Sequence, residues 1–595
     1  MAPFRRVGER RHPAPSLLDP RSGQRRGQVM FTLRQRRLID AMKGSLLTLL
    51  AVHSCVASAA ATPTQTIGIN LGMVEWGKRI YREGVLPSGR PLRALVQDDV
   101  TLTGSRAACV NCHGRSGFGS GEGQAVARPI TGPSLYNPAY PPHPKMHGSG
   151  SQSALSRPAY TDETLATALR TGIDMTGRRL NPPMPRYTLT RTESDALIAY
   201  LKTLSTAPSP GVNDQTIHFA TVATQDAEPT KQKAMLDVLE AFFRNKNAET
   251  RRETQRAERA PWDMEREYKA YRKWRLHLWT LTGRPETWRA QLEAYYRTQP
   301  VFALLSGIGA GAWQPVHDFC ERHEVPCLFP NVDFPVFSEN GYYAFYFSRG
   351  VTLEADVLAR HLSEASERSL PGPIVQIFRN DKTGRIPADA FRKAMKANGN
   401  ARVRDVGLDP AAKPTADFWR TFLKREHPAL LVLWLRDSDL RGLESLAASV
   451  LAPDRIYLSS TLSNKASSFL AADSRTKIRF VYPFELPEAL DRRLLRLKAW
   501  LKRRKLEPID ERVQANTYFA VTKAGAALMH MGDHFSRDYF VEKIEHEVDT
   551  TIATSVYPHL SLGTGRRFAS NGAYLVEPDV ERNETLVPVS RWIVP

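Results

Sequence analysis

Hydrophobic and polar positions divide the chain into three stretches with different periods. Near the start, Lys43 precedes a short apolar run, Leu46–Val52, which small residues follow. Residues 72–204 repeat apolar positions every three to four residues, as amphipathic helices do. From about 215 to 595, short apolar runs alternate with helix-period segments, which is typical of βαβ units around parallel sheets. The pattern therefore predicts a leader, a helical domain and an α/β domain.

Two helices of the middle stretch can be placed from their ends. Thr161 is a candidate N-cap for a helix that stops at Gly172. Thr192 is a candidate N-cap for a second helix, because Glu193 and Asp195 then lie in its first turn. Apolar residues further along this second helix share one face, which predicts that it packs against a core.

The α/β region contains seven candidate strands. They are Ile217–Ala223, Val301–Ser306, Tyr342–Phe347, Ile374–Phe378, Leu430–Leu435, Ile456–Ser459 and Ile478–Tyr482. Helix-period segments among them are 352–366, 386–397, 414–426, 488–502 and 512–530. So many units in about 380 residues fit two α/β lobes with a cleft between them. Such folds bind ligands at the carboxyl ends of their parallel strands.

One stretch of this region, residues 244–298, departs from the alternation. It is dense in Arg, Lys and Glu and holds four tryptophans, Trp262, Trp274, Trp279 and Trp288. Opposite charges three and four positions apart predict solvent-exposed helices here, with no strand. The tryptophans fit either packing onto a lobe or a surface for a partner.

The apolar run near the start has the pattern of a signal peptide, because small residues at 57–59 precede Ala60 as a cleavage site. The run is too short for a membrane span, and no later apolar run reaches ~18 residues. Cys55 leaves a lipid anchor as an alternative. We therefore expect 1–61 to be an N-terminal extension with a signal peptide, and the mature chain to reside in the periplasm.

The formal net charge of +20 includes +8 from residues 1–61, so the exported chain carries +12. A basic surface can attract acidic redox partners, and it can also bind nucleic acid nonspecifically. Export argues against nucleic acid, which leaves acidic partners or no charge-specific role.

Residues 109–113 form the most specific motif of the chain. Cys109-Val110-Asn111-Cys112-His113 is a C-x-x-C-H sequence, the pattern that attaches haem covalently. Its two thiols can bond to one porphyrin, and the adjacent imidazole can then reach the iron from the same side. A zinc or redox C-x-x-C is the alternative, but zinc would need two more ligands at motif spacing, and no second C-x-x-C follows.

A haem of this kind commonly takes a second axial ligand, often a methionine. Met184 lies in Leu180–Tyr187, where three prolines stiffen the loop. A weak sulfur ligand on such a loop can be held against iron with little ordering cost. The alternatives are Met146 and Met175, in polar stretches that contain Gly, and bis-His ligation through His143 or His147.

Residues from about 72 to 204 resemble a class I c-type cytochrome. The family's helix, C-x-x-C-H, G-P-x-L turn, methionine loop and final helix correspond to Trp76–Tyr81, Cys109–His113, Gly132–Leu135, Met184 and Ala196–Leu201. The resemblance implies an all-α domain at 66–204, one covalent haem c, and His113 and Met184 as axial ligands. It also implies that the Pro133 carbonyl accepts a hydrogen bond from His113 Nδ1.

The region 215–595 resembles a type 1 periplasmic binding protein of the amino-acid transporter class, though more loosely. The resemblance rests on Pro300–Gly311, a strand that ends in small residues, and on Val316–Pro330, a helix that leads into a strand. It implies that Ser306 contacts a ligand carboxylate at a helix start, with a glycine-requiring turn as the alternative. Arg349, after a later strand, is a second candidate, which either pairs with an anion or lies in solvent.

Two further cysteines, Cys320 and Cys327, lie seven positions apart at a predicted helix end and strand start. In an oxidising compartment such a pair can form a disulfide, provided that the Cα atoms are close enough. The sequence leaves bridged and unbridged forms open.

Together these features predict a soluble periplasmic c-type cytochrome that carries single electrons. A linker, 205–214, joins it to a binding-protein-like domain for docking or for sensing a small molecule. Family context suggests a periplasmic quinoprotein dehydrogenase as redox partner. We expect no catalysis by the chain itself, because it contains no G-x-S-x-G, H-E-x-x-H or phosphate-binding loop. The alternative is a solute-binding protein of an amino-acid-type ABC transporter, with the haem as an accessory redox sensor.

Overall fold

The computed structural model describes residues 71–97, 99–122, 125–139, 157–259, 272–364, 372–399, 403–441, 443, 451–463, 477–550, 554–563, 565–579 and 586–595. The chain divides into two units, 1–67 and 68–595, and the described residues all belong to the second. The predicted extension and signal peptide at 1–61 thus lie outside the described residues. Within the described ranges, no helix is both long and apolar enough to cross a membrane.

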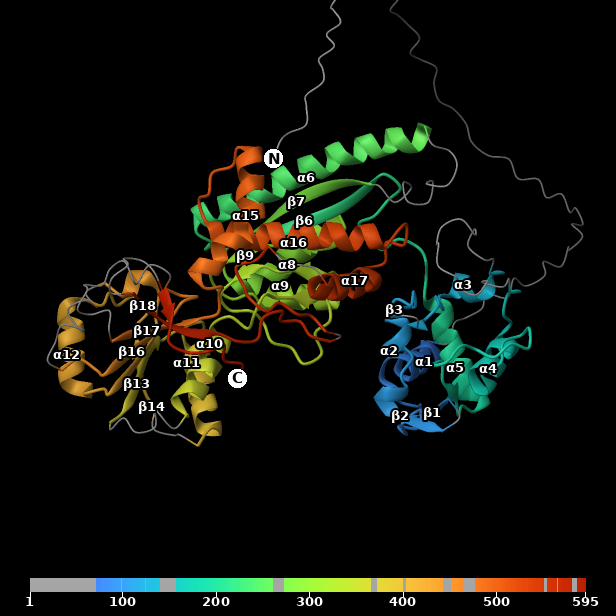
Figure 1. Ribbon diagram of the computed structural model, residues 1–595, viewed down its shortest axis with the longest axis horizontal. Helices are drawn as coiled ribbons and strands as arrows, with labels where there is room; N and C mark the ends of the chain where they lie inside the picture. Colours follow the sequence, from blue (N-terminus) through green and yellow to red (C-terminus); the bar gives the residue numbers. More distant parts are fainter. Residues whose placement is uncertain are drawn as a thin grey trace, which may run out of the picture. The chain divides into compact units, whose positions relative to one another are not determined.

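The region predicted to be a cytochrome is mainly helical (Figure 1). Its helices are α1 (Leu71–Glu83), α2 (Val110–His113), α3 (Gly132–Tyr136), α4 (Asp162–Thr171) and α5 (Arg191–Thr203), with a 3₁₀ turn η1 (Gly104–Ala107). Its strands form an antiparallel sheet, β2 (Val100–Thr103), β1 (Arg93–Val96) and β5 (Arg186–Tyr187), and a pair, β3 (Gly121–Glu122) and β4 (Ala125–Val126).

The all-α prediction for this region therefore needs correction. Ala94 of β1 lies opposite Tyr187 of β5, and both side chains are buried. The small sheet thus closes one side of the helical core at the loop that carries Met184. Its strands are only two to four residues long, which is why the sequence pattern did not reveal them.

The helix ends test the predicted caps. Thr161 caps α4 with a capping box, and Gly172 ends α4 in the left-handed region at φ +70°, as predicted. Helix α5 begins earlier than predicted, because Thr190 rather than Thr192 is its N-cap. The Glu193 side chain accepts a hydrogen bond from the Thr190 backbone N–H and completes a capping box.

The predicted linker, 205–214, is fixed to the α/β domain along part of its length. The Ser209 backbone N–H donates to the Phe535 carbonyl at 2.8 Å, and the Ser209 hydroxyl accepts from the Arg537 N–H at 3.0 Å. The Arg537 guanidinium also donates to the Pro210 carbonyl at 3.1 Å. Gly211 lies so close to the backbone of Phe302 that a side chain there would clash.

Lobe 1 of the α/β domain is built on a parallel sheet in the order β11-β9-β6-β8-β10-β12, with β7 beside β6. The strands are β6 (Thr216–Thr224), β7 (Lys273–Leu281), β8 (Ala303–Leu305), β9 (Ile308–Gly309), β10 (Cys327–Leu328), β11 (Asn331–Val332) and β12 (Ala344–Phe345). Its first helices are α6 (Pro229–Arg259), α8 (Pro285–Thr298) and α9 (Gln314–Arg322).

Contrary to prediction, the stretch 244–298 contains a strand. β7 runs parallel to β6, from Lys273 opposite Thr216 to Leu281 opposite Thr224. Within β7, basic residues alternate with apolar ones, and this period of two was hidden by the surrounding charge. The tryptophans at 274, 279 and 288 are only 2–5 % exposed, so they pack into the lobe. Trp262 lies outside the described residues.

Lobe 2 has a mixed sheet in the order β14-β13-β15-β16-β17-β18-β19. The strands are β13 (Ile374–Arg379), β14 (Val403–Leu408), β15 (Leu430–Trp434), β16 (Arg455–Ser459), β17 (Ile478–Tyr482), β18 (Tyr574–Pro578) and β19 (Leu586–Pro588). β14 to β17 pair in parallel, and the last two strands are antiparallel. The helices of lobe 2 are α10 (Val351–Leu362), α11 (Arg385–Ala397) and α12 (Ala416–Glu426), whereas α15 (Pro487–Arg504) packs against α6 of lobe 1.

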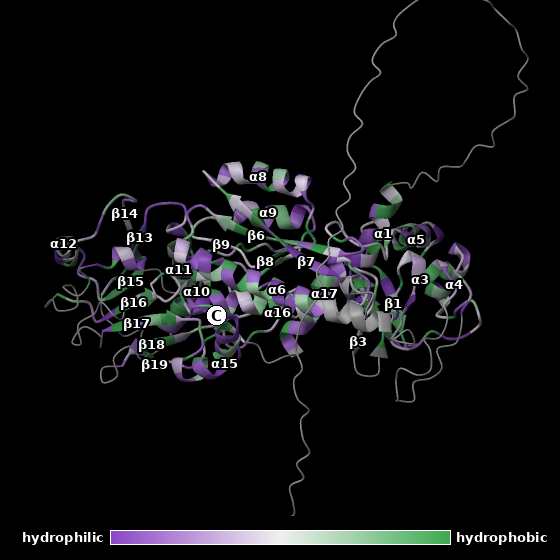
Figure 2. Ribbon diagram, turned by 90° about the horizontal axis from the view of Figure 1, so that it is seen from above, coloured by the Kyte–Doolittle hydropathy of each residue, from purple (hydrophilic) through white to green (hydrophobic). Residues whose placement is uncertain are grey.

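The central strands of lobe 2 are mostly hydrophobic in Figure 2, as expected for parallel strands that helices cover on both faces. All seven predicted strands are present in the two lobes, with ends that differ by up to two residues.

The chain crosses between the lobes more than once. After β17 it returns to lobe 1 as α15, α16 (Glu511–His530) and α17 (Arg537–Thr550). Phe519 of α16 and Phe540 of α17 join the lobe 1 core that contains Phe302. β18 then pairs with β17 and completes lobe 2. These crossings bring residues far apart in the sequence to the junction of the lobes.

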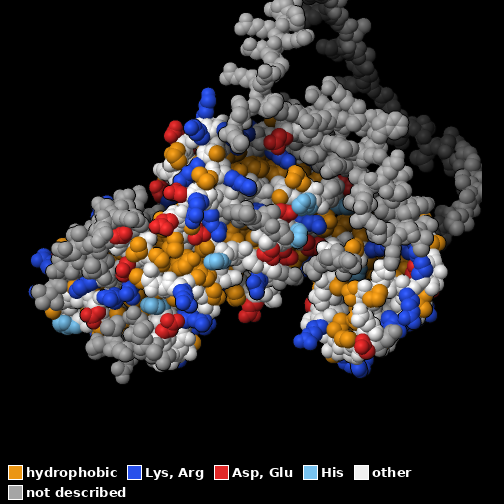
Figure 3. All heavy atoms as spheres, viewed as in Figure 1, with side chains coloured by type: hydrophobic (Ala, Val, Ile, Leu, Met, Phe, Trp, Pro, Cys, Tyr) orange, Lys and Arg blue, Asp and Glu red, His pale blue; other side chains and the backbone are white. Residues whose placement is uncertain are grey.

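The surface shows how the excess of basic residues is distributed. On the face drawn in Figure 3, described Lys and Arg side chains are interspersed with Asp and Glu. On that face the positive charge is thus not gathered into one broad patch of the kind that binds nucleic acid.

Candidate haem site and ligand cleft

The C-x-x-C-H motif forms one helical turn, α2. Cys109 is its N-cap, and the backbone N–H of His113 donates to the Cys109 carbonyl at 3.0 Å. Gly114 ends the turn with φ of +68°, which glycine adopts without strain. Cys109 is buried and Cys112 is exposed, and neither forms a disulfide. A single turn therefore presents both thiols and the imidazole together.

His113 is held by a backbone carbonyl, although not by the predicted one. Its Nδ1 lies 3.0 Å from the carbonyl oxygen of Arg128, whereas the Pro133 carbonyl accepts from the Asn137 backbone N–H at 3.2 Å. The Pro133 prediction is therefore corrected to Arg128. The physical reason is that Pro133 lies in the first turn of α3, so its carbonyl accepts the N–H that ends this short helix.

This hydrogen bond fixes the chemistry of the imidazole. A carbonyl oxygen only accepts, so Nδ1 of His113 carries the proton and Nε2 keeps a lone pair. His113 is 7 % exposed, and burial lowers its pKa, which favours the neutral ring. A neutral imidazole with an available Nε2 is the form that binds iron.

The surroundings of the motif fit a porphyrin. Cys109 belongs to the apolar core cluster of this region, and Met175 and Met184 pack against the same cluster. The Cys109 thiol lies 4.0 Å from the Tyr187 hydroxyl, and burial raises the pKa of this thiol to about 11. Two thiols, an oriented imidazole and an apolar wall thus suit a covalently attached haem.

The axial role of Met184 stays a prediction. Its side chain is partly buried, and its backbone N–H donates to the Asn181 carbonyl at 3.0 Å, which shapes the proline-rich loop. Met175 packs against the same cluster and stays an alternative. Met146, His143 and His147 lie outside the described residues.

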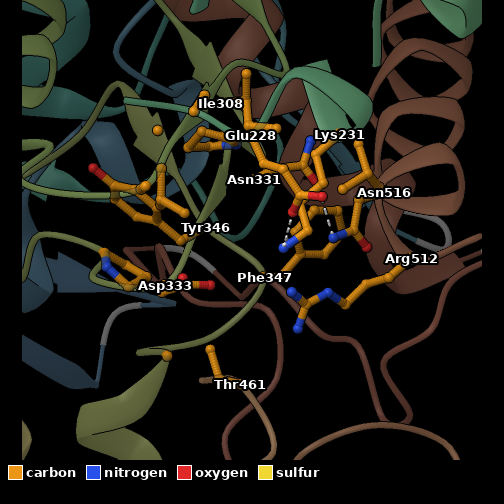
Figure 4. Close-up of a pocket in the computed structure, with 18 of the residues that line it drawn as sticks. Glu228, Lys231, Ile308, Asn331, Asp333, Tyr346, Phe347, Thr461, Arg512 and Asn516 are labelled. Atoms are coloured by element: carbon orange, nitrogen blue, oxygen red, sulfur yellow. Dashed lines mark hydrogen bonds and ion pairs between the residues drawn. The ribbon is translucent and has the colours of Figure 1, made fainter. Parts of the chain in front are cut away.

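A cavity of about 220 Å³ lies at the junction of the two lobes (Figure 4). Its wall comes from residues within five stretches of the chain, 226–231, 308–310, 330–335, 346–350 (without Arg349) and 512–516, and from the single residues Arg436, Thr461 and Tyr557. We call this cavity the ligand cleft. Most of the lining residues lie at or just after the carboxyl ends of the parallel strands β6, β9, β11, β12, β15 and β16, where such folds bind ligands.

Arg436 bridges the cleft from lobe 2 to lobe 1. Its guanidinium donates to Asp333 Oδ2 at 3.0 Å and to the Ala310 carbonyl at 3.0 Å. Arg436 follows β15 in lobe 2, whereas both partners follow strands of lobe 1. This pair of contacts holds the lobes together across the cleft.

Arg512 and Asn516, both on α16, offer polar groups to a ligand (Figure 4). Among the described residues Arg512 has no carboxylate partner, and its guanidinium lies 5.4 Å from the Phe484 ring centroid. Asn516 is buried, and its Nδ2 donates to Asn331 Oδ1 at 3.0 Å while its own Oδ1 has no partner. The cleft therefore presents the Arg512 cation, next to a buried amide oxygen of Asn516 that has no hydrogen-bond partner.

The two ligand residues suggested by the sequence do not line this cavity. Ser306 is buried, its hydroxyl lies 3.2 Å from the Thr517 hydroxyl, and it accepts from Asn331 Nδ2 at 3.1 Å. Arg349 donates to Asp356 Oδ2 at 2.7 Å. Ser306 thus lies behind Asn331, which itself lines the cleft, and Arg349 is occupied by an ion pair.

The cleft residues that sequence analysis missed are Asn331, Arg436 and Arg512. Asn331 lies within β11 and Arg436 two residues after β15, so position at a strand end was the usable signal. Arg512 lies in the first turn of a helix, and nothing in its local sequence marks it.

Cys320 and Cys327 form a disulfide in the structure, between the end of α9 and β10 of lobe 1. Their Cα atoms are 6.2 Å apart, within the range that a disulfide spans.

Comparison with protein families identifies one part of the chain. Residues 103–205 match the cytochrome c family, so this part is a cytochrome c domain, and such a domain implies a haem. The match includes the C-x-x-C-H turn, the corrected His113 contact and the Met184 loop. No curated protein matches the chain.

Among solved structures, the chain is similar to periplasmic binding proteins. A fatty acid ABC transporter substrate-binding protein from Thermomonospora curvata has 14 % identity and a TM-score of 0.46, over 65 % of this chain and 95 % of that one. A possible leucine/isoleucine/valine-binding protein from Rhodopirellula baltica has 12 % identity and a TM-score of 0.47, over 64 % and 98 %. Similarity at this level carries no argument about a ligand, and the two-lobed fold stands on the strand order described above.

Proposed function

We propose that this chain is a c-type cytochrome that carries one electron at a time outside the cytoplasm. A single haem c is bonded to Cys109 and Cys112, with His113 and Met184 as axial ligands. The α/β domain docks the cytochrome to a redox partner or responds to a small molecule. The chain performs no catalysis of its own.

The oriented imidazole beside the two thiols is the observation that carries this proposal. His113 has its Nδ1 proton fixed by the Arg128 carbonyl and its Nε2 left for a metal. A haem bound at this turn supplies a one-electron iron couple, while the protein orients the ligand and keeps water away from it.

Location outside the cytoplasm is supported by the leader pattern at 43–60 and by the cytochrome c domain. The Cys320–Cys327 disulfide agrees with an oxidising compartment. A periplasmic quinoprotein dehydrogenase is the proposed electron donor.

The proposal is tested on the full exported chain, made in a host with working cytochrome maturation. A reduced-minus-oxidised absorbance spectrum should show a c-type haem, and intact mass should rise by one haem. Alkylation without reductant should label neither Cys109 nor Cys112. A colourless product with both thiols labelled contradicts the proposal.

The cleft favours a second candidate, a solute-binding protein of a transporter with the haem as an accessory redox sensor. Its basis is Arg512 without a carboxylate partner in the described chain, beside the vacant Asn516 Oδ1. Calorimetric titration with amino acids and small carboxylates separates the candidates. Micromolar binding favours the transporter role, whereas rapid haem reduction by a quinoprotein dehydrogenase without added ligand favours electron transfer.

A further inference from the structure

The residues after the C-x-x-C-H motif, Gly114–Phe118, pack against helix α17 of the α/β domain, and we call them the haem loop. The Glu542 carboxylate accepts two hydrogen bonds from Ser116, one from its backbone N–H at 2.9 Å and one from its hydroxyl at 2.6 Å. Gly114 lies against the same carboxylate, since a Cβ there would sit 2.5 Å from Glu542 Oε1. One carboxylate of the α/β domain thus holds the haem loop.

Aromatic contacts surround this carboxylate. The buried Phe118 ring lies 4.6 Å from the His534 ring and 4.7 Å from the Tyr539 ring, centroid to centroid. The Arg115 guanidinium lies 3.6 Å from the Tyr342 ring centroid, which is cation–π geometry. The haem loop is therefore packed on its α/β side by rings as well as by hydrogen bonds.

Charge also matches across this contact. Arg82 of α1 pairs with Asp538 at 3.6 Å, and the cytochrome's Arg115 adds a second cation opposite the acidic face of α17. Opposed charges of this kind fix the orientation of two surfaces more than they add affinity. We call Asp538, Tyr539 and Glu542 the α17 clamp.

Strand β12 joins this clamp to the ligand cleft. The two residues before it, Tyr342 and Tyr343, contact the haem loop and the clamp, and the Tyr343 hydroxyl donates to Asp538 Oδ1 at 2.6 Å. The two residues after it, Tyr346 and Phe347, line the cleft (Figure 4). Only the two residues of the strand separate the two contacts.

Arg567 braces this strand. Its guanidinium lies 4.7 Å from the ring centroids of Tyr342 and Phe345, and it donates to Glu545 of α17 at 2.6 Å. Its carbonyl accepts from the Tyr346 backbone N–H at 2.8 Å. Arg567 thus connects α17 and β12 through its buried side chain, and the wall of the cleft through its backbone carbonyl.

We propose that the α17 clamp and β12 couple the ligand cleft to the haem, so that a change in cleft closure changes the reduction potential. The coupling rests on the proposed function, because it needs the haem. The haem loop begins directly after His113, so a displaced clamp alters the position and hydrogen bonding of the axial imidazole. These are two of the features by which a protein sets the potential of a bound haem.

The test is a double-mutant cycle in the full holoprotein. Arg436→Ala removes the bridge across the cleft, and Glu542→Ala removes both hydrogen bonds to Ser116. We expect Arg436→Ala to change the ratio of reduced to oxidised haem at a fixed electrode potential by about fivefold or more. In the Glu542→Ala background, Arg436→Ala should leave this ratio unchanged.

Matched controls remove exposed ion pairs away from the clamp. Arg420→Ala acts in lobe 2, where Arg420 pairs with Asp417, and Glu240→Ala acts in lobe 1, where Glu240 pairs with Arg244. Neither should change the ratio. If Glu542→Ala fails to fold, Glu542→Gln replaces it, since a neutral amide retains one acceptor for two donors.

A second measurement does not depend on the haem. Hydrogen exchange of the Ser116 amide should accelerate in Glu542→Ala, because its acceptor is lost. If the native protein is colourless but its Ser116 amide exchanges more slowly than in Glu542→Ala, the proposed function is contradicted, whereas the contact between the α17 clamp and the haem loop is confirmed. A normal haem spectrum with the same Arg436→Ala shift in both backgrounds, or with no shift at all, overturns the coupling.

Discussion

The haem segment and the ligand cleft are assembled from the chain in opposite ways. The haem segment uses five consecutive residues on one helical turn, whereas the cleft collects residues between positions 226 and 557 from both lobes. Covalent attachment needs two thiols at one fixed spacing, which a single turn supplies. A cleft exists only after two lobes have met. Substitutions in the motif should therefore abolish haem attachment completely, whereas a single substitution in the cleft should weaken its function only in part.

The most severe test of this difference changes Cys109 and Cys112 to Ser together. We expect complete loss of covalent haem, because both thioether bonds disappear. Haem staining after denaturing electrophoresis measures it. The matched control changes Cys320 and Cys327 to Ser and should keep its haem, since that pair belongs to lobe 1. Covalent haem retained in the first variant would contradict the assignment.

The next largest effect is expected at Arg537, the first residue of α17. This arginine is 6 % exposed, and its guanidinium donates to five backbone carbonyls, those of Pro210, Val301, Phe302, His323 and Glu324. Arg537→Ala leaves these acceptors buried without their donor, so we expect a loss of about 3–5 kcal/mol in the free energy of unfolding.

Urea unfolding of the full chain measures this loss. Arg420→Ala, which breaks an exposed pair, should change the free energy of unfolding by less than ~1 kcal/mol. A small effect at Arg537 would mean that the linker is not anchored as described. The same variant should raise hydrogen exchange at Ser209, because it removes the guanidinium that holds the adjacent Pro210 carbonyl.

The same contrast explains how far sequence analysis reached. Features that depend on residues close together in the sequence were predicted correctly: the C-x-x-C-H turn, the Thr161 cap and the seven strands. The cap of α5 was misplaced by two residues, although Thr190 and Glu193 have the T-x-x-E spacing of a capping box. Strand β7 was missed because its charged residues, which lie on one face, were read as helix surface.

Contacts that depend on the tertiary fold were beyond local sequence. The His113 partner is Arg128 because a loop folds back onto the ring, and no motif encodes that return. Likewise, Arg436 meets Asp333 only when lobe 2 closes on lobe 1. The chemistry of the haem site was thus predictable from residue types, whereas its supporting contacts and the cleft needed the fold.

A buried carboxylate next to the cleft, Glu354, should make the stability of the α/β domain depend on pH. Glu354 of α10 is fully buried, and its Oε1 accepts from the backbone N–H and the hydroxyl of Thr461, a cleft residue. Burial raises the pKa of Glu354 to about 7, above its ordinary value of 4.5. The folded state thus favours the protonated acid, a preference that stabilises it below the ordinary pKa and is lost as pH rises through about 7.

The Glu354→Gln side chain cannot ionise. Relative to this variant, the free energy of unfolding of the native chain should fall by on the order of 3 kcal/mol between about pH 4 and about pH 8. Urea unfolding at several pH values measures the difference. In the control Glu240→Gln, which changes an exposed carboxylate, the free energy of unfolding should depend on pH as it does in the native chain. Parallel curves for Glu354→Gln would mean that Glu354 ionises normally.

The smallest effect concerns the two cysteine pairs themselves. The Cys320–Cys327 disulfide closes a loop of only seven positions, so its reduction should lower the free energy of unfolding by about 2 kcal/mol. The thioether bonds proposed at Cys109 and Cys112 would resist the same reductant, so the haem should stay attached. Unfolding followed by tryptophan fluorescence, with and without dithiothreitol, measures the loss of stability. Haem absorbance of the protein after separation from the reductant shows whether the haem stays attached. The Cys320→Ser, Cys327→Ser variant should be insensitive to dithiothreitol; release of haem by the reductant would show that the motif does not hold it through thioethers.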